Sequence, residues 1–495
     1  MRLKVASQDA STESVAVDTL PDENGGILSS PLVRAVCGTA LVIALWVTFF
    51  VAVALGTAPV SDPDTWWHLV MGGKFLDGTS VRDPGAMSYL GTEDWHSRDW
   101  GTQLLASQFE RWFALPGVAW LFTAGLVVLL VAVYRLARSR AGFAAATLTV
   151  FIGLWAAMGS LTPRPQLVSF VLLVVLLGAL TRTTDDLKAR VWIAPLTGVW
   201  ACLHGLWFVS PVLQAVVIGG LVLDRRLDAR SAGRHVGVVL LSLAAVAVTP
   251  NGLALLADPL GPTNSDLSRY VAETSPPSLD SSYFVFALAM LGVIGLTWVR
   301  RGVPVDWTRI LLLALAAGFC VLMARTVTLG ALVAVPLFAE ALDHWLKGLR
   351  LHVPPRLERA ALYGVAAAAL VVSAFVVPQR ADAPATSLPV ALDASLDILP
   401  SDAVVLNELS DGGYLAWRHP ELRITVDGLS DQYAASYLAE VYATGELGPG
   451  WQEFVAGVGA THALLFQGSP LAEALRLQGW TVQAESPARL LLESP

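Results

Sequence analysis

The densest group of chemically capable side chains lies at residues 61–68, which read Ser-Asp-Pro-Asp-Thr-Trp-Trp-His. Asp62 followed by Pro63 is typical of a helix start, with Asp62 as the N-cap and Pro63 at the first helical position. Asp64 then falls in the first turn, and His68 lies four residues later on the same face. A carboxylate at this place is suited to take a proton from a hydroxyl group as a general base. Because Asp62 already has a capping role, we favour Asp64 as the base, with His68 able to orient it.

A second polar and aromatic cluster follows at residues 93–100. Tryptophan offers a flat apolar face and acidic groups accept hydrogen bonds from hydroxyls, a combination that suits a sugar. The plainer alternatives are that the tryptophans anchor the chain at a membrane surface and that Glu93 is a solvated loop residue. The substrate-binding candidates from the two clusters are Trp66, Trp67, Glu93, Trp95, His96, Arg98 and Trp100.

Further polar residues fall at the ends of apolar runs. Arg164 lies between two prolines, Arg325 separates two apolar runs, and His204 separates two others. Charges at membrane depth are costly and are functional candidates by default. A guanidinium group matches a phosphate with two parallel hydrogen bonds, so Arg164 and Arg325 are candidates to bind one. Each arginine can instead simply extend to the membrane surface, and His204 can simply satisfy a nearby carbonyl.

These residues belong to a chain with the composition of a membrane protein. Of its 495 residues, 55% are hydrophobic and 15% are charged, and the mean hydropathy is +0.59. A soluble domain carries about 25% charged residues, so part of this chain is expected to be solvated by lipid. The net charge of −8 argues against a nucleic-acid partner. The three cysteines lie far apart in apolar runs, which argues against a disulfide framework.

The apolar runs predict a polytopic α-helical membrane protein. Eleven runs are candidates for spanning helices: 36–56, 116–134, 143–158, 167–180, 191–203, 206–223, 236–248, 283–299, 310–323, 327–342 and 360–377. Several are shorter than the ~20 residues that cross a bilayer. Lysine and arginine cluster after every even-numbered run and are sparse after the odd-numbered ones. The positive-inside rule then predicts about eleven transmembrane helices, with the N-terminus in the cytosol and the C-terminus outside.

This topology divides the chain into three parts. Residues 1–30 are predicted to be a disordered cytosolic tail, and residues 31–378 a transmembrane domain with outer loops at 57–115 and 249–282. Amphipathic helices at the membrane surface are expected within the first loop, at 66–76 and 104–113.

Residues 379–495 are predicted to form an extracytoplasmic, soluble α/β domain with a mixed sheet. The expected strands are 404–406, 423–426, 463–466, 481–483 and 490–492, and the expected helices are 413–417, 433–442 and 471–477.

Several short motifs occur together along the chain. The run from Asp62 to Leu69 is followed by Gly73, Asp83-Pro84, Ser88-Tyr89, Trp95 and Trp100. Later motifs are Arg164-Pro165-Gln166, Leu203-His204-Gly205, Pro250-Asn251-Gly252, Glu273, Asp411-Gly412-Gly413-Tyr414, Asp427-Gly428 and Gly479-Trp480. With these motifs the chain resembles bacterial membrane proteins of the GT-C glycosyltransferase superfamily, distantly like the protein mannosyltransferase type. The resemblance extends over essentially the whole chain after the N-terminal tail.

The resemblance implies a glycosyltransferase that uses a polyprenyl-phosphate-linked sugar at the outer face of the bacterial plasma (inner) membrane. GT-C enzymes place an acidic residue after the first helix, where it contacts the acceptor, and Asp62 and Asp64 have that position here. Basic residues at outer helix ends hold the lipid phosphate in these relatives, the position of Arg164 and Arg325. The chain has Asp-Pro-Asp where the protein O-mannosyltransferases have Asp-Glu. The acceptor, a glycan or a lipid, is therefore left open.

The resemblance also bears on cofactors and on further site residues. It adds Gln166, Asn251 and Glu273 to the substrate-binding candidates. Some members of the superfamily need a divalent cation and others do not. Asp62, Asp64 and His68 are the candidate ligands for Mg²⁺ or Mn²⁺, although these ions prefer sites made of oxygen alone.

Two other function classes stay open beside hexosyl or pentosyl transfer. A transporter or flippase of lipid-linked glycans should show inverted repeats or charge in the middle of helices, and neither is evident in the sequence. A non-catalytic membrane component would instead use its outer domain to bind a glycan or another partner.

Overall fold

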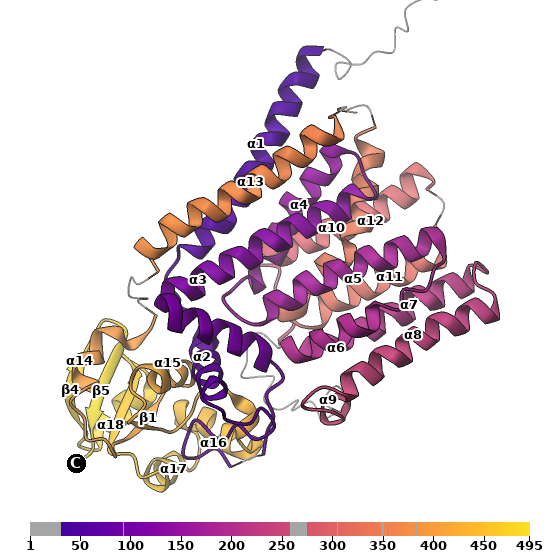
Figure 1. Ribbon diagram of the computed structural model, residues 1–495. Helices are drawn as coiled ribbons and strands as arrows, with labels where there is room; N and C mark the ends of the chain where they lie inside the picture. Colours follow the sequence, from indigo (N-terminus) through magenta and orange to yellow (C-terminus); the bar gives the residue numbers. More distant parts are fainter. Residues whose placement is uncertain are drawn as a thin grey trace, which may run out of the picture.

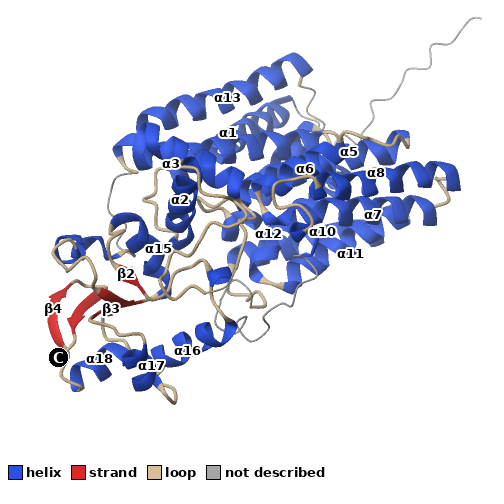
Figure 2. Ribbon diagram, turned by 60° about the horizontal axis from the view of Figure 1, so that its bottom comes forward, coloured by secondary structure: helices blue, strands red, loops and turns tan. Residues whose placement is uncertain are grey.

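The computed structural model describes residues 31–92, 94–257, 275–303, 305–347, 351, 353–381, 385 and 387–495. These residues form a bundle of long helices with a smaller domain of helices and strands at one end (Figure 1 and Figure 2). The tail expected at residues 1–30 lies outside the described residues.

Every apolar run expected to cross the membrane lies in a helix. The helices of the bundle are α1 (Pro31–Gly56), α3 (Trp100–Arg138), α4 (Phe143–Ala157), α5 (Gln166–Asp186), α6 (Ile193–Leu203), α7 (Val209–Leu223), α8 (Ala229–Ala247), α10 (Ser282–Arg301), α11 (Trp307–Leu322), α12 (Val327–Trp345) and α13 (Pro355–Val376). In the described part of the chain, 8 helices are long and apolar enough to cross a membrane, as expected of a multi-pass membrane protein. The count of eleven stays a prediction, because α6 and α11 are short and α8 is not among the 8.

Short 3₁₀ segments extend several of these helices at the connections between them. They are η2 (Met158–Ser160), η3 (Gly205–Phe208), η7 (Ala324–Thr326) and η8 (Val377–Gln379). The second outer loop contains the one-turn helix α9 (Ala254–Ala257).

Helix α12 lies inside the bundle and packs against α4, α10 and α11. In its most apolar stretch, 78% of the residues are buried. A β-carbon added at Gly330 would lie 2.5 Å from the Ala316 carbonyl oxygen of α11. Glycine is required where two helix backbones approach this closely, so this residue sets the contact between α11 and α12.

Helix α3 joins a surface segment to a membrane span. The amphipathic helix expected at 104–113 and the span expected at 116–134 form one element of 39 residues, broken at Ala114, where φ is 52°. Pro116 lacks an amide hydrogen, so the regular hydrogen-bond pattern cannot continue through this point. Trp112 and Phe113, just before the break, are 62% and 60% exposed, as expected of side chains at a membrane surface.

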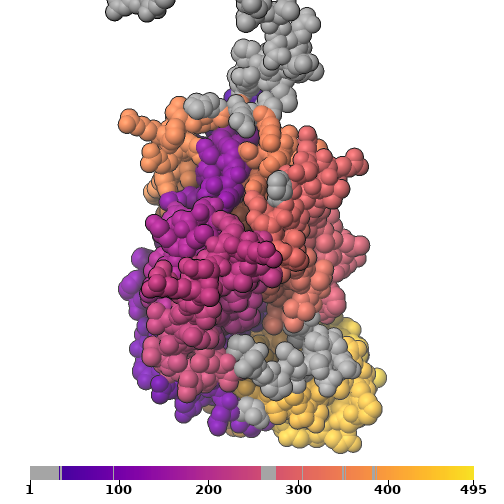
Figure 3. All heavy atoms as spheres, turned by 90° about the vertical axis from the view of Figure 1, so that its right-hand side faces the viewer, coloured from indigo at the N-terminus to yellow at the C-terminus, as the bar shows by residue number. Residues whose placement is uncertain are grey.

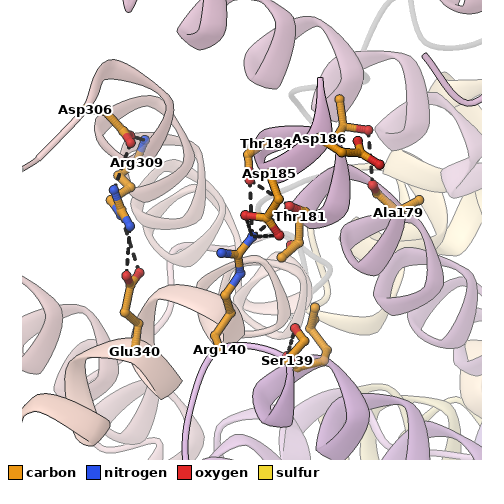
Figure 4. A network of polar contacts seen from close by, with 12 residues as sticks. Ser139, Arg140, Ala179, Thr181, Thr184, Asp185, Asp186, Asp306, Arg309 and Glu340 are labelled. Carbon is orange, nitrogen blue, oxygen red and sulfur yellow. Dashed lines mark hydrogen bonds and ion pairs between the residues drawn. The ribbon is translucent and has the colours of Figure 1, made fainter. Parts of the chain in front are cut away.

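Ion pairs join the helices at the end of the bundle that is expected to face the cytosol (Figure 4). Arg309 contacts Asp306 and the Glu340 carboxylate of α12, each at 2.8 Å. Arg140 lies 3.0 Å from Asp185 at the end of α5. The arginines of the positive-inside pattern therefore also connect neighbouring helices.

The C-terminal domain contains a five-stranded sheet in the order β2-β1-β3-β5-β4. Strands β1 (Val404–Asn407), β2 (Arg423–Ile424) and β3 (His462–Phe466) are parallel to one another. Strand β5 (Arg489–Glu493) pairs antiparallel with β3 and with the edge strand β4 (Thr481–Glu485). The mixed sheet and all five expected strands are confirmed. The other elements are η9 (Pro389–Leu392), α14 (Asp393–Leu396), α15 (Leu409–Arg418), η10 (Ser430–Gln432), α16 (Ala435–Gly445), α17 (Trp451–Gly457) and α18 (Pro470–Leu477).

This domain packs closely on the first outer loop, which contains α2 (Pro63–Leu76) (Figure 1 and Figure 3). Ser88 donates its hydroxyl hydrogen to the Ile424 carbonyl at 2.9 Å. The side-chain oxygen of Gln432 accepts a hydrogen bond from the Met87 amide at 2.8 Å. The C-terminal domain and the first outer loop are therefore hydrogen-bonded to each other, and the boundary at residue 379 stays a prediction.

The alternation of arginine-rich connections predicts where fused reporters will be found. A reporter placed after Pro378 should be extracytoplasmic, and one placed within 185–188 should be cytosolic, because positive loops are retained inside. Paired alkaline phosphatase and green fluorescent protein fusions at both positions measure this. Finding both positions on one side of the membrane would contradict the eleven-helix topology.

Candidate active site at the start of helix α2

Three charged side chains meet at the first turn of α2. Asp62 is the N-cap, as predicted, and its carboxylate accepts a hydrogen bond from the Asp64 amide at 3.0 Å. Arg164, from the connection between α4 and α5, donates through Nε to both Asp62 oxygens, at 2.8 and 2.7 Å. Its Nη1 lies 3.0 Å from Asp64 Oδ2. The Asp62 and Arg164 side chains are only 6% and 17% exposed, so these charge-assisted hydrogen bonds form largely away from water.

This arrangement bears on two expectations, and both roles stay predictions. Asp64 is favoured as the base partly because the sequence leaves its side chain without a structural role, whereas the folded chain pairs it with Arg164. Arg164 is expected to face a phosphate, whereas its guanidinium group lies against two carboxylates. The physical reason is the distance in sequence: residues 62 and 164 come together only when the bundle assembles.

The connection that carries Arg164 is bonded to its surroundings on both sides. The Pro163 carbonyl accepts a hydrogen bond from the Thr65 hydroxyl at 2.9 Å. The Gln166 amide donates to the Ser160 carbonyl at 2.9 Å, so Gln166 supports the connection. The flanking prolines restrict the backbone further, and the guanidinium group is held in one position.

His68 lies on the same helix as Asp64 but is bonded elsewhere. Its Nδ1 is 2.9 Å from the side-chain nitrogen of Gln103, and the Gln103 oxygen accepts a hydrogen bond from Ser97 at 2.7 Å. Burial lowers the pKa of His68 well below its usual range, and the charges of His204 and Arg164 lower it further. The imidazole is therefore neutral at neutral pH, and it anchors α2 to α3 through Gln103.

Asp99 ties the first outer loop to the connection between α6 and α7. Its carboxylate accepts a hydrogen bond from the Gly205 amide at 3.1 Å. One turn further along α3, the Thr102 hydroxyl donates to the Leu203 carbonyl at 2.7 Å. These bonds hold the backbone on both sides of His204.

His204 lies within electrostatic reach of several charged groups of the outer face. Its Nδ1 is 2.9 Å from the Ser169 hydroxyl oxygen. Burial lowers the pKa of His204, Asp99 raises it, and Arg98 and Arg325 lower it. Arg325 is itself exposed, in η7. The structure thus gathers Arg98, His204 and Arg325, which are far apart in the sequence, around one part of the outer face.

The rest of the first outer loop contacts the second outer loop and the C-terminal domain. The Asn251 side chain donates to the Ser97 carbonyl at 2.6 Å. Arg98 forms an ion pair with Asp431 of the C-terminal domain. The Trp95 indole donates to the Gly85 carbonyl at 3.1 Å, and His96 is half-buried beside it in the chain.

The tryptophans expected to bind a sugar fall into two groups. Trp66 is 2% exposed, and its ring centroid lies 5.2 Å from that of Tyr414 and 4.8 Å from that of Trp417. Since both partners belong to α15, Trp66 joins the loop to the C-terminal domain. Its ring is occupied by packing and does not present a free face to a sugar.

Trp67, Trp95 and Trp100 form the second group, in one apolar cluster with Met71 of α2. The Trp67 ring lies against the His68 ring, with centroids 3.6 Å apart. Trp95 and Trp100 are partly buried and pack against this cluster, whereas Trp66 is almost fully buried.

Several polar atoms around this cluster are buried without a hydrogen-bond partner. They are the indole nitrogens of Trp66, Trp67 and Trp100, the side-chain oxygen of Asn251 and the hydroxyl of Thr162. Buried polar atoms are nearly always paired, and exceptions call for an explanation such as a bound polar group. These atoms lie in and around the first outer loop, so they are candidates to bond to a ligand with hydroxyl or phosphate groups.

Comparison with known proteins gives the fold. No protein-family model and no curated protein matches the chain. The apo oligosaccharyltransferase of Archaeoglobus fulgidus is 13% identical, with a TM-score of 0.53 over 86% of this chain and 69% of that one. The oligosaccharyltransferase AglB from the same organism, in complex with an inhibitory peptide and a dolichol-phosphate, is also 13% identical, with a TM-score of 0.50 over 85% and 69%.

A second kind of enzyme matches over nearly its whole length. Apo ArnT from Cupriavidus metallidurans is 15% identical, with a TM-score of 0.51 over 92% of this chain and 98% of that one. ArnT and the oligosaccharyltransferase are both GT-C glycosyltransferases. The chain has the GT-C fold. The fold class expected from the sequence motifs is therefore confirmed.

The carboxylates at the start of α2 do not form the three-ligand cation site expected from the sequence. Among the described residues, no group of three or more His, Cys, Asp and Glu side chains is placed to hold a metal ion. His68 is bonded to Gln103, and the Arg164 guanidinium group lies against Asp62 and Asp64. A divalent cation at these carboxylates would have to displace Arg164.

Two predicted residues, Glu93 and Glu273, lie outside the described residues. Sequence reasoning in turn missed Gln103, Asp99 and Asp427. Of these three, only Asp427 could have been found from a sequence motif, because the Asp427-Gly428 pair is among the motifs of the C-terminal region. Asp99 lies in the polar cluster at 93–100 but is not among its named candidates, Gln103 is a single polar residue without a pattern, and only the folded chain reveals the partners of both.

Asp427 is a buried carboxylate of the C-terminal domain with four hydrogen-bond contacts. Its carboxylate accepts hydrogen bonds from the backbone amide of Leu429 at 2.7 Å and from the Tyr433 hydroxyl at 2.9 Å. The side-chain nitrogen of Gln432 donates to both of its oxygens, at 2.9 and 2.8 Å. Burial raises the pKa of Asp427 to about 6, although these bonds and Lys74 of α2 lower it.

This raised pKa predicts how stability depends on pH. Because Asp427 binds its proton more tightly in the folded protein, folding loses stability as the pH rises from the ordinary carboxylate range through about 6. Between about pH 5 and about pH 8, the melting temperature of the wild type should fall by roughly 1–2 °C relative to that of Asp427→Asn. Thermal unfolding in detergent measures this.

The control for this prediction is Asp402→Asn, which changes an exposed carboxylate of the same domain. Its difference in melting temperature from the wild type should stay constant over the same range. A constant difference for Asp427→Asn as well would contradict the predicted linkage.

Proposed function

We propose that this protein is a membrane glycosyltransferase that moves a hexosyl or pentosyl group from a polyprenyl-phosphate donor to an envelope acceptor at the outer face of the plasma membrane. The observation that carries the proposal is the meeting of Asp62, Asp64 and Arg164 at the start of α2, in a chain with the GT-C fold. A dolichol-phosphate is bound in one of the similar structures, which supports a polyprenyl-phosphate carrier here.

In this proposal Asp64 is the general base. It accepts the proton of an acceptor hydroxyl while the hydroxyl oxygen forms a bond to the anomeric carbon of the sugar. The bond from that carbon to the phosphate oxygen of the donor breaks, and its electron pair leaves with the polyprenyl phosphate. Asp64 is better placed than Asp62 for this role, because its side chain is 28% exposed and that of Asp62 is 6% exposed.

Arg164 has two proposed tasks. Its contacts with Asp62 and Asp64 hold the base in place, and its positive charge favours the negative charge that develops on the leaving phosphate. Arg325, exposed at the outer end of the bundle, is proposed to bind the donor phosphate directly. The unpartnered indole nitrogens of Trp67 and Trp100 are proposed to donate to sugar hydroxyls.

The first prediction of this proposal concerns the base. Asp64→Asn keeps the shape of the side chain but removes its ability to take a proton, so turnover should fall by about 10²–10⁴-fold with folding intact. The assay is transfer of radiolabelled sugar from a panel of polyprenyl-phosphate-linked hexoses and pentoses to an envelope extract. Asp62→Asn should lose less turnover at matched folding, because asparagine still caps α2 and the proton acceptor Asp64 is kept, although the loss of the charge that pairs with Arg164 should lower the melting temperature.

The matched control is Asp77→Asn. Asp77 follows the same helix and is also paired with an arginine, Arg111, at 2.7 Å, but its side chain is 68% exposed. The turnover of Asp77→Asn should equal that of the wild type. Full activity of Asp64→Asn in variants of equal melting temperature would show that the catalytic centre lies elsewhere, and an inactive Asp62→Asn beside an active Asp64→Asn would reverse the two roles.

The second prediction concerns Arg164. Arg164→Ala should weaken donor binding and turnover together, because it removes the charge near the phosphate and leaves Asp62 and Asp64 without their partner. Arg164→Lys should recover only part of the loss, since an ammonium group cannot contact two carboxylates as a guanidinium group does. Donor KM and kcat are measured for both, with exposed Arg356→Ala as the control. Unchanged turnover and donor affinity in Arg164→Ala would rule out this role.

A cellular experiment tests the reaction class. If the protein is a transferase, deletion of its gene should remove one glycan feature of the envelope and increase the polyprenyl-linked sugar that supplies it. Mass spectrometry of envelope glycans and of lipid-linked sugars detects both changes. Restoration by the wild type but not by Asp64→Asn would tie the change to catalysis, whereas restoration by both would favour a non-catalytic role.

A further inference from the structure

The Asp427-Gly428 pair of the C-terminal domain lies directly against the proposed base. A β-carbon added at Gly428 would lie 2.7 Å from Asp64 Oδ1 and 3.2 Å from Trp67 Nε1. The other oxygen of the same carboxylate, Oδ2, is 3.0 Å from Arg164 Nη1. The Asp64 carboxylate is therefore enclosed between a guanidinium group of the helix bundle and the backbone of the C-terminal domain.

The backbone at Gly428 is held in place by its neighbours. The Asp427 carboxylate accepts hydrogen bonds from the Leu429 amide and from Gln432. The side-chain oxygen of Gln432 in turn accepts a hydrogen bond from the Met87 amide of the first outer loop, at 2.8 Å. Gly428 thus belongs to a network that bonds the domain to the loop that carries α2, and it cannot withdraw from Asp64 without breaking this network.

A second glycine fixes the approach of the domain to α2. A β-carbon at Gly413, in α15, would lie 3.0 Å from the Pro63 carbonyl oxygen and 3.2 Å from the Trp67 backbone nitrogen. Here the neighbours are backbone atoms of the first turn of α2, which cannot rotate away. The lack of a side chain at Gly413 allows the two elements to touch, and this contact sets the distance between Gly428 and Asp64.

We propose that Gly428 positions the Asp64 carboxylate, so that the C-terminal domain is a working part of the active site. This inference rests on the proposed function and deepens it. With only a hydrogen atom at position 428, the carboxylate fits between the domain and Arg164. A methyl group there displaces Oδ1, and because Oδ1 is the end of a rotatable side chain, the carboxylate moves while the fold is kept.

Kinetics of Gly428→Ala test the consequence. A displacement of a catalytic group by about 1 Å costs up to about 10²-fold in rate. Using the polyprenyl-phosphate-linked sugar that the wild type accepts, kcat should fall by about 10–100-fold while the donor KM changes by less than about threefold. The matched control is Gly457→Ala in the same domain, where an added β-carbon meets nothing within 4 Å and kcat should be unchanged.

A stability cycle tests the contact without any activity. Gly428→Ala should lower the melting temperature in the wild-type background and lower it much less in the Asp64→Ala background, where the obstructing oxygen is gone. Equal losses in both backgrounds would overturn the inference, as would failure to fold in both. If Gly428→Ala folds only in the Asp64→Ala background, the contact is supported.

The role of Asp64 as the base and the positioning role of Gly428 can be refuted independently. If Asp64→Asn is fully active, the proposed base is wrong, and the stability cycle still reports whether Gly428 touches Asp64. If Asp64→Asn is inactive but Gly428→Ala turns over like the wild type, the proposed function stands and the positioning role of Gly428 is overturned.

Discussion

The ion pairs of Arg164 with Asp62 and Asp64 are the interaction on which the outer face of this protein depends. Three charged groups taken largely out of water are costly unless they satisfy one another, and here one guanidinium group contacts two carboxylates. One of these carboxylates caps α2 and the other belongs to its first turn. The start of α2 is thus fixed to the connection between α4 and α5, and the elements that contact α2 take their positions from it.

The first outer loop acts as the common partner of the other outer segments. Thr65 bonds to Pro163, Asp99 to Gly205, and Ser97 to Asn251, which come from three different connections of the bundle. Met87 and Ser88 bond to the C-terminal domain. Loss of any one bond leaves the others in place, whereas displacement of the loop would disturb every segment at once. The polar groups proposed to act in catalysis are brought together by this shared loop.

The two ends of the bundle use charge differently. At the end expected to face the cytosol, arginines join neighbouring helices, as Arg309 joins α11 to Glu340 of α12. At the outer end, arginines lie beside carboxylates, histidines and unpartnered indoles. Ion pairs of the first kind stabilise helix packing, and a cluster of the second kind is suited to bind an anionic, hydroxyl-bearing ligand.

The sequence by itself determined the elements that depend on local pattern. The apolar runs are helices because a backbone in lipid must bond to itself, and Asp62-Pro63 starts α2 because these residues suit the first turn. The strands of the C-terminal domain also follow from their local pattern. The sequence motifs likewise predict the GT-C fold.

Only the tertiary structure decided which residues meet. Arg164 lies 100 residues or more from its two partners, Gln103 carries no pattern of its own, and Gly428 reaches Asp64 from another part of the chain. Trp66, expected to face a sugar, is instead packed against Tyr414 and Trp417. Local periodicity records which face of a helix is apolar, but it holds no information on which distant group that face will contact. These pairings arise from the packing of the whole chain.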